Sequence, residues 1–460
     1  MSLNKHHLSR TLALVLGAGA LAPSAAQAAP AKSDALSFDM NVETFTLDNG
    51  LRVYVVEDHS TPAFNMTLMY NVGARNEVPG KTGFAHLFEH MMFEGSKNVP
   101  PMGHLTFVQR VGGNNNAGTS FDTTTYYNNL PSQYLDLGLW LESDRLRSLE
   151  ITAENFENQR NAVKEEKAMR VDNVPYAGAI QDWLVSAWQG TGYDHMPIGS
   201  LEDLNSVQVD YVQQFFNMYY APDNAVLVFV GDVTVPELKA KVTQYFGDIP
   251  KGKDRPPARA AKVDRNKPLV ETKKDPLAQQ AIYLYGWHTV GETHPDRPAL
   301  DLLGNVLLVG DSARIPKILQ DEKKLVAGAG GAHFALQDAG LVFVQALPLP
   351  DTKFDDIKQV IREEADKIIA KGISNKELQK AINAQVMGTV STLATNQGRA
   401  TAIAQGALFH NDPKHVITEL ARYRAVTPAD IKRVAKDYLT SNLLSLEIQP
   451  GAGGAMGAMK

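Results

Sequence analysis

The sequence falls into two halves that repeat one order of strands and helices, and this repetition restricts the fold more than any other feature. Each half, about 38–250 and about 277–449, begins with short strands and continues into long helices that carry an apolar stripe. Strands that lead into runs of helices are typical of α+β folds. We therefore expect an α+β fold of two duplicated halves, each a mainly antiparallel sheet packed with helices. The expected strands are 43–47, 51–56, 63–72, 119–129, 224–230, 281–287 and 341–347, and the expected helices are 83–93, 133–149, 152–170, 235–246, 297–309, 354–371 and 375–389.

Several segments outside the halves have compositions of their own. Residues 251–276 are basic, proline-rich and poor in apolar residues, which predicts an exposed linker. The glycine-rich end of the chain, 450–460, predicts a disordered tail. Residues 108–118, rich in Gly and Asn, predict a turn region.

The first 28 residues match a secretory signal peptide. Lys5 and Arg10 precede the short apolar run 11–22, and Ala26-Gln27-Ala28 is a small-x-small cleavage pattern. Residues 29–37 would form a flexible N-terminus, and no later apolar run has the length of a membrane span. We expect an exported protein without a membrane anchor, located in a periplasm.

Composition narrows the chemistry. The 460 residues contain no cysteine, which excludes disulfides, iron–sulfur clusters, thiol catalysis and cysteine zinc sites. The net charge of −6 argues against a nucleic-acid binder. Any metal must therefore be held by His, Asp or Glu.

The segment His86-Leu87-Phe88-Glu89-His90 is the sharpest signal in the sequence. On a helix, residues four apart lie on one face, so His86 and His90 can bind one Zn²⁺. Glu89 shares that face and is placed to take a proton from a water molecule. The order H-x-x-E-H is the inverted form of a common zinc-protease motif. The alternative is a core helix whose histidines bond to each other and to Glu89.

A third ligand is expected on the helix 152–170. Phe156, Val163 and Glu166 lie on one continuous stripe that must pack inward, whereas Glu165 points about 100° away, toward solvent. A buried carboxylate needs a partner. Zinc would be that partner for Glu166; a Lys or Arg would be the alternative.

The chain resembles the pitrilysin/insulinase-like zinc peptidases, the inverzincins that include mitochondrial processing peptidase. The 76 positions from His90 to Glu166 match the separation in that family, and 160–166 resembles the family's ligand segment, with Gln159 where many members have an acid. Other matching runs extend the resemblance across the first half: 116–119, Phe121, 126–127, 219–222, 231–232 and 246–250.

The resemblance implies a zinc metalloendopeptidase that hydrolyses unfolded peptides. Glu89 would act as general base, with Zn²⁺ held by His86, His90 and Glu166. Asn116, Ala117 and Phe121 would bind the peptide along an edge strand; ordinary turn and core roles are the alternative for Asn116 and Phe121.

One departure from the family suggests a partner. In the second half the family has an Arg and, seven residues later, a Tyr that reach the reaction intermediate, whereas this chain has Gln320 and Ala327. We expect a paralogous subunit to supply the pair in a heterodimer; a homodimer stays open. The rival readings are a catalytically silent assembly subunit and a metal-buffering protein, although the chain has no His-rich or acidic tract. The scattered histidines are interpreted as surface or satisfied core residues: His59, His104, His195, His288, His294, His333, His410 and His415.

Overall fold

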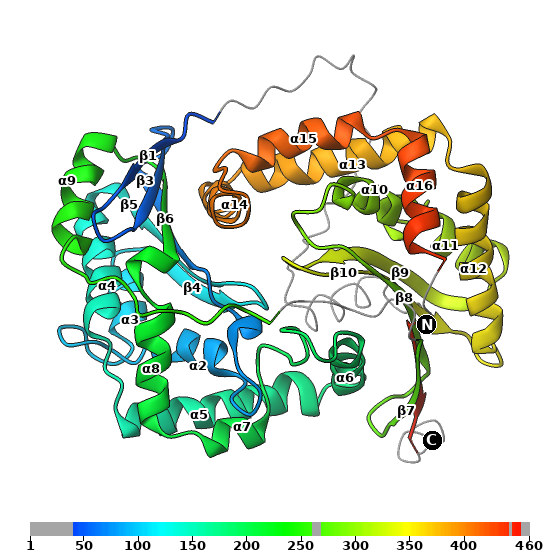
Figure 1. Cartoon of the computed structure of the whole chain (residues 1–460), viewed down its shortest axis with the longest axis horizontal. Coiled ribbons are helices and arrows are strands. Elements are labelled where there is room, and N and C mark those ends of the chain that lie inside the picture. Colours follow the sequence, from blue (N-terminus) through cyan, green and yellow to red (C-terminus); the bar gives the residue numbers. More distant parts are fainter. Residues whose placement is uncertain (1–39, 260–267, 441–443, 452–460) are drawn as a thin grey trace.

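A computed structural model describes residues 40–259, 268–440 and 444–451 (Figure 1). The predicted signal peptide 1–28 and flexible N-terminus 29–37 lie outside the described residues. The predicted tail 450–460 also lies outside them, except for its first two residues, and Pro450 belongs to the last strand. Within the described ranges, none of the helices is both long and apolar enough to cross a membrane.

Each half contains one sheet, and the two sheets have the same topology. In the first half the order is β1-β2-β6-β3-β5-β4, and in the second it is β7-β11-β8-β10-β9. In each sheet one pair is parallel, β2 with β6 and β7 with β11, and the other neighbours are antiparallel. Apart from the additional β1, the halves are duplicates, which confirms the predicted fold class. The strands are β1 Glu43–Thr46, β2 Arg52–Glu57, β3 Ala63–Tyr70, β4 Asn114–Thr119, β5 Thr124–Pro131, β6 Ala225–Gly231, β7 Leu269–Asp275, β8 Ile282–Thr289, β9 Val326–Ala335, β10 Gly340–Pro348 and β11 Leu444–Pro450.

Helices cover one face of each sheet and bury a core of its own half. In the first half they are α2 Phe84–Met91, α3 Gly103–Arg110, α4 Leu135–Ser148, α5 Ala153–Lys167 with the π-helical η3 Ala168–Asp172, α6 Ala177–Ala187, α7 Leu201–Ser206, α8 Val209–Tyr219 and α9 Val235–Phe246. In the second half they are α10 Arg297–Leu308, α11 Arg314–Pro316 with the π-helical η5 Lys317–Glu322, α12 Phe354–Lys371, α13 Asn375–Leu393, α14 Asn396–Phe409, α15 His415–Ala425 and α16 Pro428–Tyr438.

The other face of each sheet is covered by a helix from the opposite half. Helix α14 packs Ile403 and Ala404 against the second face of β6, and α6 packs Ile180 and Trp183 against β8, β10 and β11 (Figure 1). The central strands β6 and β8 are therefore buried along their whole length, which explains why 224–230 reads as a continuous apolar run. The exchange of helices joins the halves through apolar surfaces.

Two predictions about local structure are wrong. Residues 269–275 of the predicted linker 251–276 form β7, a strand of the second sheet. Residues 114–118 of the predicted turn region belong to β4. Both are edge strands, so they carry polar side chains on their exposed positions and resemble loops in composition.

Candidate metal centre

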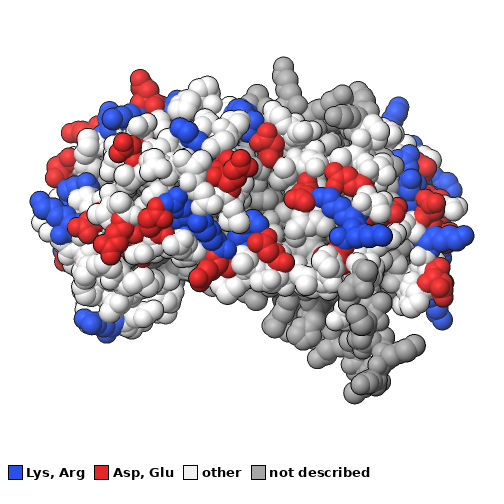
Figure 2. All heavy atoms as spheres, turned by 90° about the horizontal axis from the view of Figure 1, so that it is seen from below, with Lys and Arg blue, Asp and Glu red and all other residues white. Residues whose placement is uncertain are grey.

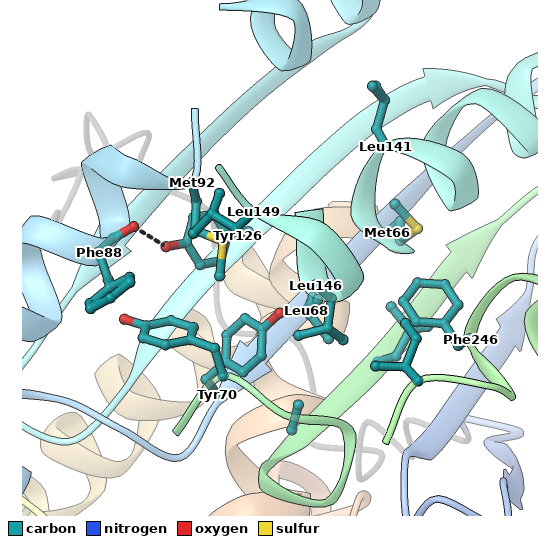
Figure 3. Packing of buried hydrophobic residues seen from close by; sticks show 14 of the residues in the cluster. Met66, Leu68, Tyr70, Phe88, Met92, Tyr126, Leu141, Leu146, Leu149 and Phe246 are labelled. Carbon is teal, nitrogen blue, oxygen red and sulfur yellow. Dashed lines mark hydrogen bonds between the residues drawn. The ribbon is translucent and has the colours of Figure 1, made fainter. Parts of the chain in front are cut away.

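Helix α2 presents three polar side chains from an otherwise buried segment. Gly83 precedes it with φ +90°, and a Cβ there would lie 2.8 Å from the Ile198 carbonyl oxygen, so the entry to the helix requires glycine. The apolar residues of α2 are buried, and the Tyr126 hydroxyl donates to the Phe88 carbonyl oxygen at 3.1 Å (Figure 3). This packing fixes the helix. His86, Glu89 and His90 stay half-buried.

Helix α5 brings the distant carboxylate. The Thr152 hydroxyl caps it by accepting from the Asn155 N–H at 3.1 Å. The helix buries Phe156 and Val163. The Glu166 side chain on the same side is only 14% exposed, whereas Glu165 is exposed, as the helical period predicts.

The three side chains meet in a geometry that fits a zinc ion. Glu166 Oε2 lies 3.1 Å from His90 Nε2 and 3.5 Å from His86 Nε2. Ligand atoms about 2.1 Å from a tetrahedral zinc ion lie about 3.4 Å from each other. Among the described residues, His86, His90 and Glu166 are the one group of three whose ligand atoms all lie within 4.8 Å of one another. Two imidazoles and a carboxylate also form a known catalytic donor set for zinc, with a fourth position open.

The protonation tendencies of His86 and Glu166 agree with ligation, whereas His90 tends to hold a proton that a metal ion would displace. Burial lowers the pKa of His86 to about 4, which keeps its imidazole neutral. The hydrogen bond with His90 lowers the pKa of Glu166, which stays ionised. Burial lowers the pKa of His90, but the hydrogen bond and charge of Glu166 outweigh it and raise the pKa overall. A neutral imidazole and an ionised carboxylate are the forms that bind metals.

Glu89 has a different environment from Glu166. Burial raises the pKa of Glu89, although hydrogen bonding with Thr119 at the end of β4 opposes the rise. A glutamate with a raised pKa beside a candidate metal centre is suited to general acid–base chemistry, because it holds a proton more readily than a solvated carboxylate does.

A cavity of about 600 Å³ opens beside the centre, between the two halves. The first half contributes His86 and Glu166 to its wall, and α14, α15 and the loop that joins them contribute the opposite side. The sequence interpretation missed two of the lining residues, His410 and His415. Their rings stack with centroids 3.4 Å apart at the junction of α14 and α15, and only the fold brings this junction to the cavity.

Comparison with known proteins places the chain in a family. Residues 52–191 match the sequence model for insulinase, peptidase family M16, and residues 206–385 match the model described as the peptidase M16 inactive domain. The chain belongs to the M16 peptidase family. It is 29% identical over 401 residues to the zinc protease PqqE of Helicobacter pylori, covering 86% of this chain and 90% of the relative.

Further M16 relatives agree in sequence and structure. An uncharacterized zinc protease of Streptomyces coelicolor, SCO5738, is 25% identical over 407 residues, covering 86% of this chain and 87% of the relative. The crystal structure of a protease from Helicobacter pylori superposes with a TM-score of 0.83 at 27% identity, covering 89% of this chain and all of that one.

In this M16 chain the N-terminus of helix α2 is held by the buried carboxylate of Glu77, which the sequence patterns do not single out. Glu77 accepts hydrogen bonds at 2.7 Å from the N–H groups of both Gly83 and Ala85, at the N-terminus of α2. His195 Nε2 lies 2.9 Å from the same carboxylate. The side chain of Glu77 is fully buried. No sequence pattern marks a capping carboxylate that lies seven residues before the first residue of its helix.

Replacing Glu77 with Gln should weaken both the fold and the metal centre. A Gln amide has one acceptor oxygen, so at least one of the three donors around it would lose its partner. We expect the free energy of unfolding to fall by about 1–3 kcal/mol. We also expect zinc affinity to fall by about 10–100-fold, because Glu77 holds in place the helix that carries His86 and His90, and contacts that orient metal ligands usually contribute this much. Chemical denaturation and zinc titration would measure both effects. Glu154→Gln, an exposed acid in the first turn of α5, is the control and should leave zinc affinity unchanged and lower stability by less than about 1 kcal/mol. An unaltered zinc affinity in Glu77→Gln would contradict the positioning role.

The residues that the M16 resemblance assigns to peptide binding lie in two settings. Asn116 and Ala117 are on the edge strand β4, whose only strand partner within the described part of the chain is β5. Phe121 lies beyond the end of β4 and lines the cavity, but it is only 6% exposed. Its ring packs against Trp188 and Tyr193 in the core between the halves.

Gln320 and Ala327, at the positions where the resemblance implies Arg and Tyr, are not among the residues that line the cavity. Gln320 is in η5, where its side chain accepts from the Ala329 N–H at 3.2 Å, and Ala327 is at the start of β9. The other end of β9, at Phe334 and Ala335, lines the cavity. Eight residues of strand separate the two ends by about 26 Å.

Most of the scattered histidines have ordinary partners. His104 Nε2 lies 3.1 Å from the Leu141 carbonyl oxygen, His288 contacts the Ala187 carbonyl oxygen, and His333 pairs with Asp301. His410 and His415 also face carboxylates: their Nε2 atoms lie 3.7 and 3.6 Å from Glu292 Oε1 and Glu419 Oε1, beyond ordinary hydrogen-bond distance.

Proposed function

We propose that this chain is a zinc metalloendopeptidase that cleaves unfolded peptides at the centre formed by His86, His90 and Glu166. The observation that carries the proposal is the convergence of these three ligand atoms beside a cavity, with Glu89 one residue from a ligand. Named zinc proteases among the relatives support zinc as the ion. A bound zinc ion would supply a Lewis acid and lower the pKa of a water molecule.

The side chains of this protein have distinct tasks in the proposed reaction. His86, His90 and Glu166 hold the ion. Glu89 accepts a proton from the attacking water and returns it to the leaving amine. The free edge of β4, with Asn116 and Ala117, is available to pair with an extended peptide backbone. Phe121 would support this edge from the core.

A paralogous subunit that supplies an Arg and a Tyr would complete the site. Gln320 and Ala327 cannot stabilise an oxyanion as a guanidinium and a phenol do, and their places on η5 and β9 are remote from the cavity. A homodimer would repeat the same two residues, so it could not supply the pair. We therefore prefer a heterodimer, in a periplasm, as the export pattern at 1–28 suggests. Recovery of the protein from the cytoplasm of its native host with residues 1–28 still attached would overturn the location.

The competing candidate is a silent assembly subunit, favoured by the missing Arg and Tyr. The match to the model named for an inactive domain covers 206–385 and therefore excludes the metal ligands. The half that contains the metal ligands matches the insulinase model instead.

Acidic and basic side chains are mixed on the face of the molecule drawn in Figure 2, and no extended basic patch is visible on that face. This charge distribution agrees with a partner other than nucleic acid.

Metal removal tests the proposal. The purified chain is stripped with a chelator, reloaded with zinc and assayed on quenched fluorogenic unfolded peptides, alone and with the paralogue co-purified from the native host. We expect cleavage to vanish on stripping and to return with zinc, and the paralogue to raise it by about 10²–10³-fold, the usual effect of an oxyanion donor. Zinc-independent cleavage, or none in either preparation, would contradict the proposal. Full activity of the single chain would remove the need for the partner.

A further inference from the structure

Arg170 is a cation at the metal centre that the proposed reaction does not use. It lies in η3, one helical turn beyond Glu166, and lines the same cavity as His86 and Glu166. Its Nη1 lies 2.8 Å from Glu166 Oε1, whereas Glu166 Oε2 is the oxygen that lies within 3.5 Å of both histidines. Its side chain is 64% exposed, so most of its five N–H donors remain available at the cavity.

The other arginine of the cavity wall is already neutralised. Arg297 lies within 3.4 Å of three carboxylates, those of Glu292, Asp301 and Glu419. Arg170 has one ion pair among the described residues, and its partner Glu166 would share its charge with a bound divalent ion. Arg170 is therefore the less neutralised of the two cavity arginines, whereas Glu292 and Glu419 lie on the wall from the second half.

An ion pair between residues four apart on an exposed helix surface usually contributes little. Arg170 differs from such a pair because its guanidinium lies at a cavity beside reactive groups. The π-helical turn Ala168–Asp172 that carries it is a feature often found at functional sites. The planar fork of a guanidinium matches a carboxylate in two parallel hydrogen bonds.

We propose that Arg170 binds a carboxylate of the peptide substrate, an Asp or Glu side chain close to the scissile bond, and so makes this chain prefer acidic peptides. The inference rests on the proposed peptidase function, since it names the substrates of the same site. Arg170 is a specificity residue: it recognises the substrate and takes no part in proton transfer.

A binding assay tests the inference without any turnover. Neutral peptides with a single Glu at successive positions are compared with matched peptides that carry Gln instead. Their dissociation constants are measured by fluorescence anisotropy on the zinc-loaded Glu89→Gln variant. We expect the Glu peptide to bind about 10- to 100-fold more tightly than its Gln counterpart at one or two adjacent positions, the usual range for a hydrogen bond to a charged group.

Substitution of Arg170 distinguishes a role in recognising the peptide carboxylate from a role in supporting the fold of the site. Arg170→Gln, in the Glu89→Gln background, should bring the ratio of the two dissociation constants to about one with zinc content unchanged, and Arg170→Lys should restore part of it. Lys167→Gln removes a cation that pairs with Asp172 and is not among the residues that line the cavity, so it should leave the ratio intact. Equal weakening of both peptides by Arg170→Gln, or no preference in the unsubstituted site, would overturn the inference. Failure of the peptidase proposal would instead appear as absent cleavage in the chain that retains Glu89.

Discussion

Glu89→Gln is expected to lower peptide cleavage by about 10²–10⁴-fold, the range that general acid–base catalysis contributes. Gln has nearly the shape of Glu but cannot accept and return a proton. Burial raises the pKa of Glu89, so this carboxylate holds a transferred proton more readily than a solvated one. Turnover of a fluorogenic peptide, with zinc content measured on the same sample, checks the prediction.

The substitution should leave the metal centre intact, because the ligand atoms belong to His86, His90 and Glu166. Zinc content and the thermal unfolding midpoint should therefore match those of the unaltered chain. Glu150→Gln, at an exposed position outside the cavity, is the control and should retain full turnover. If Glu89→Gln cleaved peptides at the normal rate, the general base would have to be another group.

Periodicity in the sequence predicts the amphipathic helices well, including α2 and α5, which carry the candidate site and are predicted to within one to three residues at each end. The helices α9 and α12 begin and end at the predicted residues, because each has one apolar stripe and clear start and stop signals. The duplication was visible as a repeated order of elements, and the two sheets share one topology. Local patterns succeeded here because tertiary contacts reinforce them.

Long-range pairing was beyond the sequence. Strand β7 resembles a linker in composition, because the positions that alternate outward along this edge strand are polar. Only its pairing with β11 makes it part of the sheet. The run 224–230 predicted a buried strand but could not show that α14, from the other half, covers its second face. Each contact joins residues more than 150 positions apart.

The candidate site likewise contains residues that local sequence patterns predict and residues that only long-range contacts reveal. Helix geometry alone predicts that His86 and His90 lie on one face of their helix. It also predicts that the side chain of Glu166 points toward the core. Glu77, which anchors α2, and Arg170, at the cavity, have no motif that identifies them. Their roles follow from which surfaces the fold brings together.

Glu166→Ala is expected to abolish stoichiometric zinc binding, with a loss larger than the roughly 10–100-fold that an outer contact contributes, and cleavage should disappear with the metal. Two imidazoles would remain, without the carboxylate that now lies 3.1 and 3.5 Å from their Nε2 atoms. Glu165→Ala is the matched control, since the same change falls one residue earlier and about 100° around the helix. Competition with a chromophoric chelator would measure both affinities.

Thermal unfolding gives a second test that does not depend on activity. A ligand that binds only the folded state raises its stability in proportion to the logarithm of its concentration over the dissociation constant. Zinc should therefore raise the unfolding midpoint of the unaltered chain and of Glu165→Ala, but not that of Glu166→Ala. Because Glu165 is exposed and Glu166 faces the two histidines, equal behaviour of the two variants would mean that the ion binds elsewhere. If zinc raises the unfolding midpoint only of chains that retain Glu166, the ion binds at Glu166, the carboxylate that the helical period places on the inward side of α5.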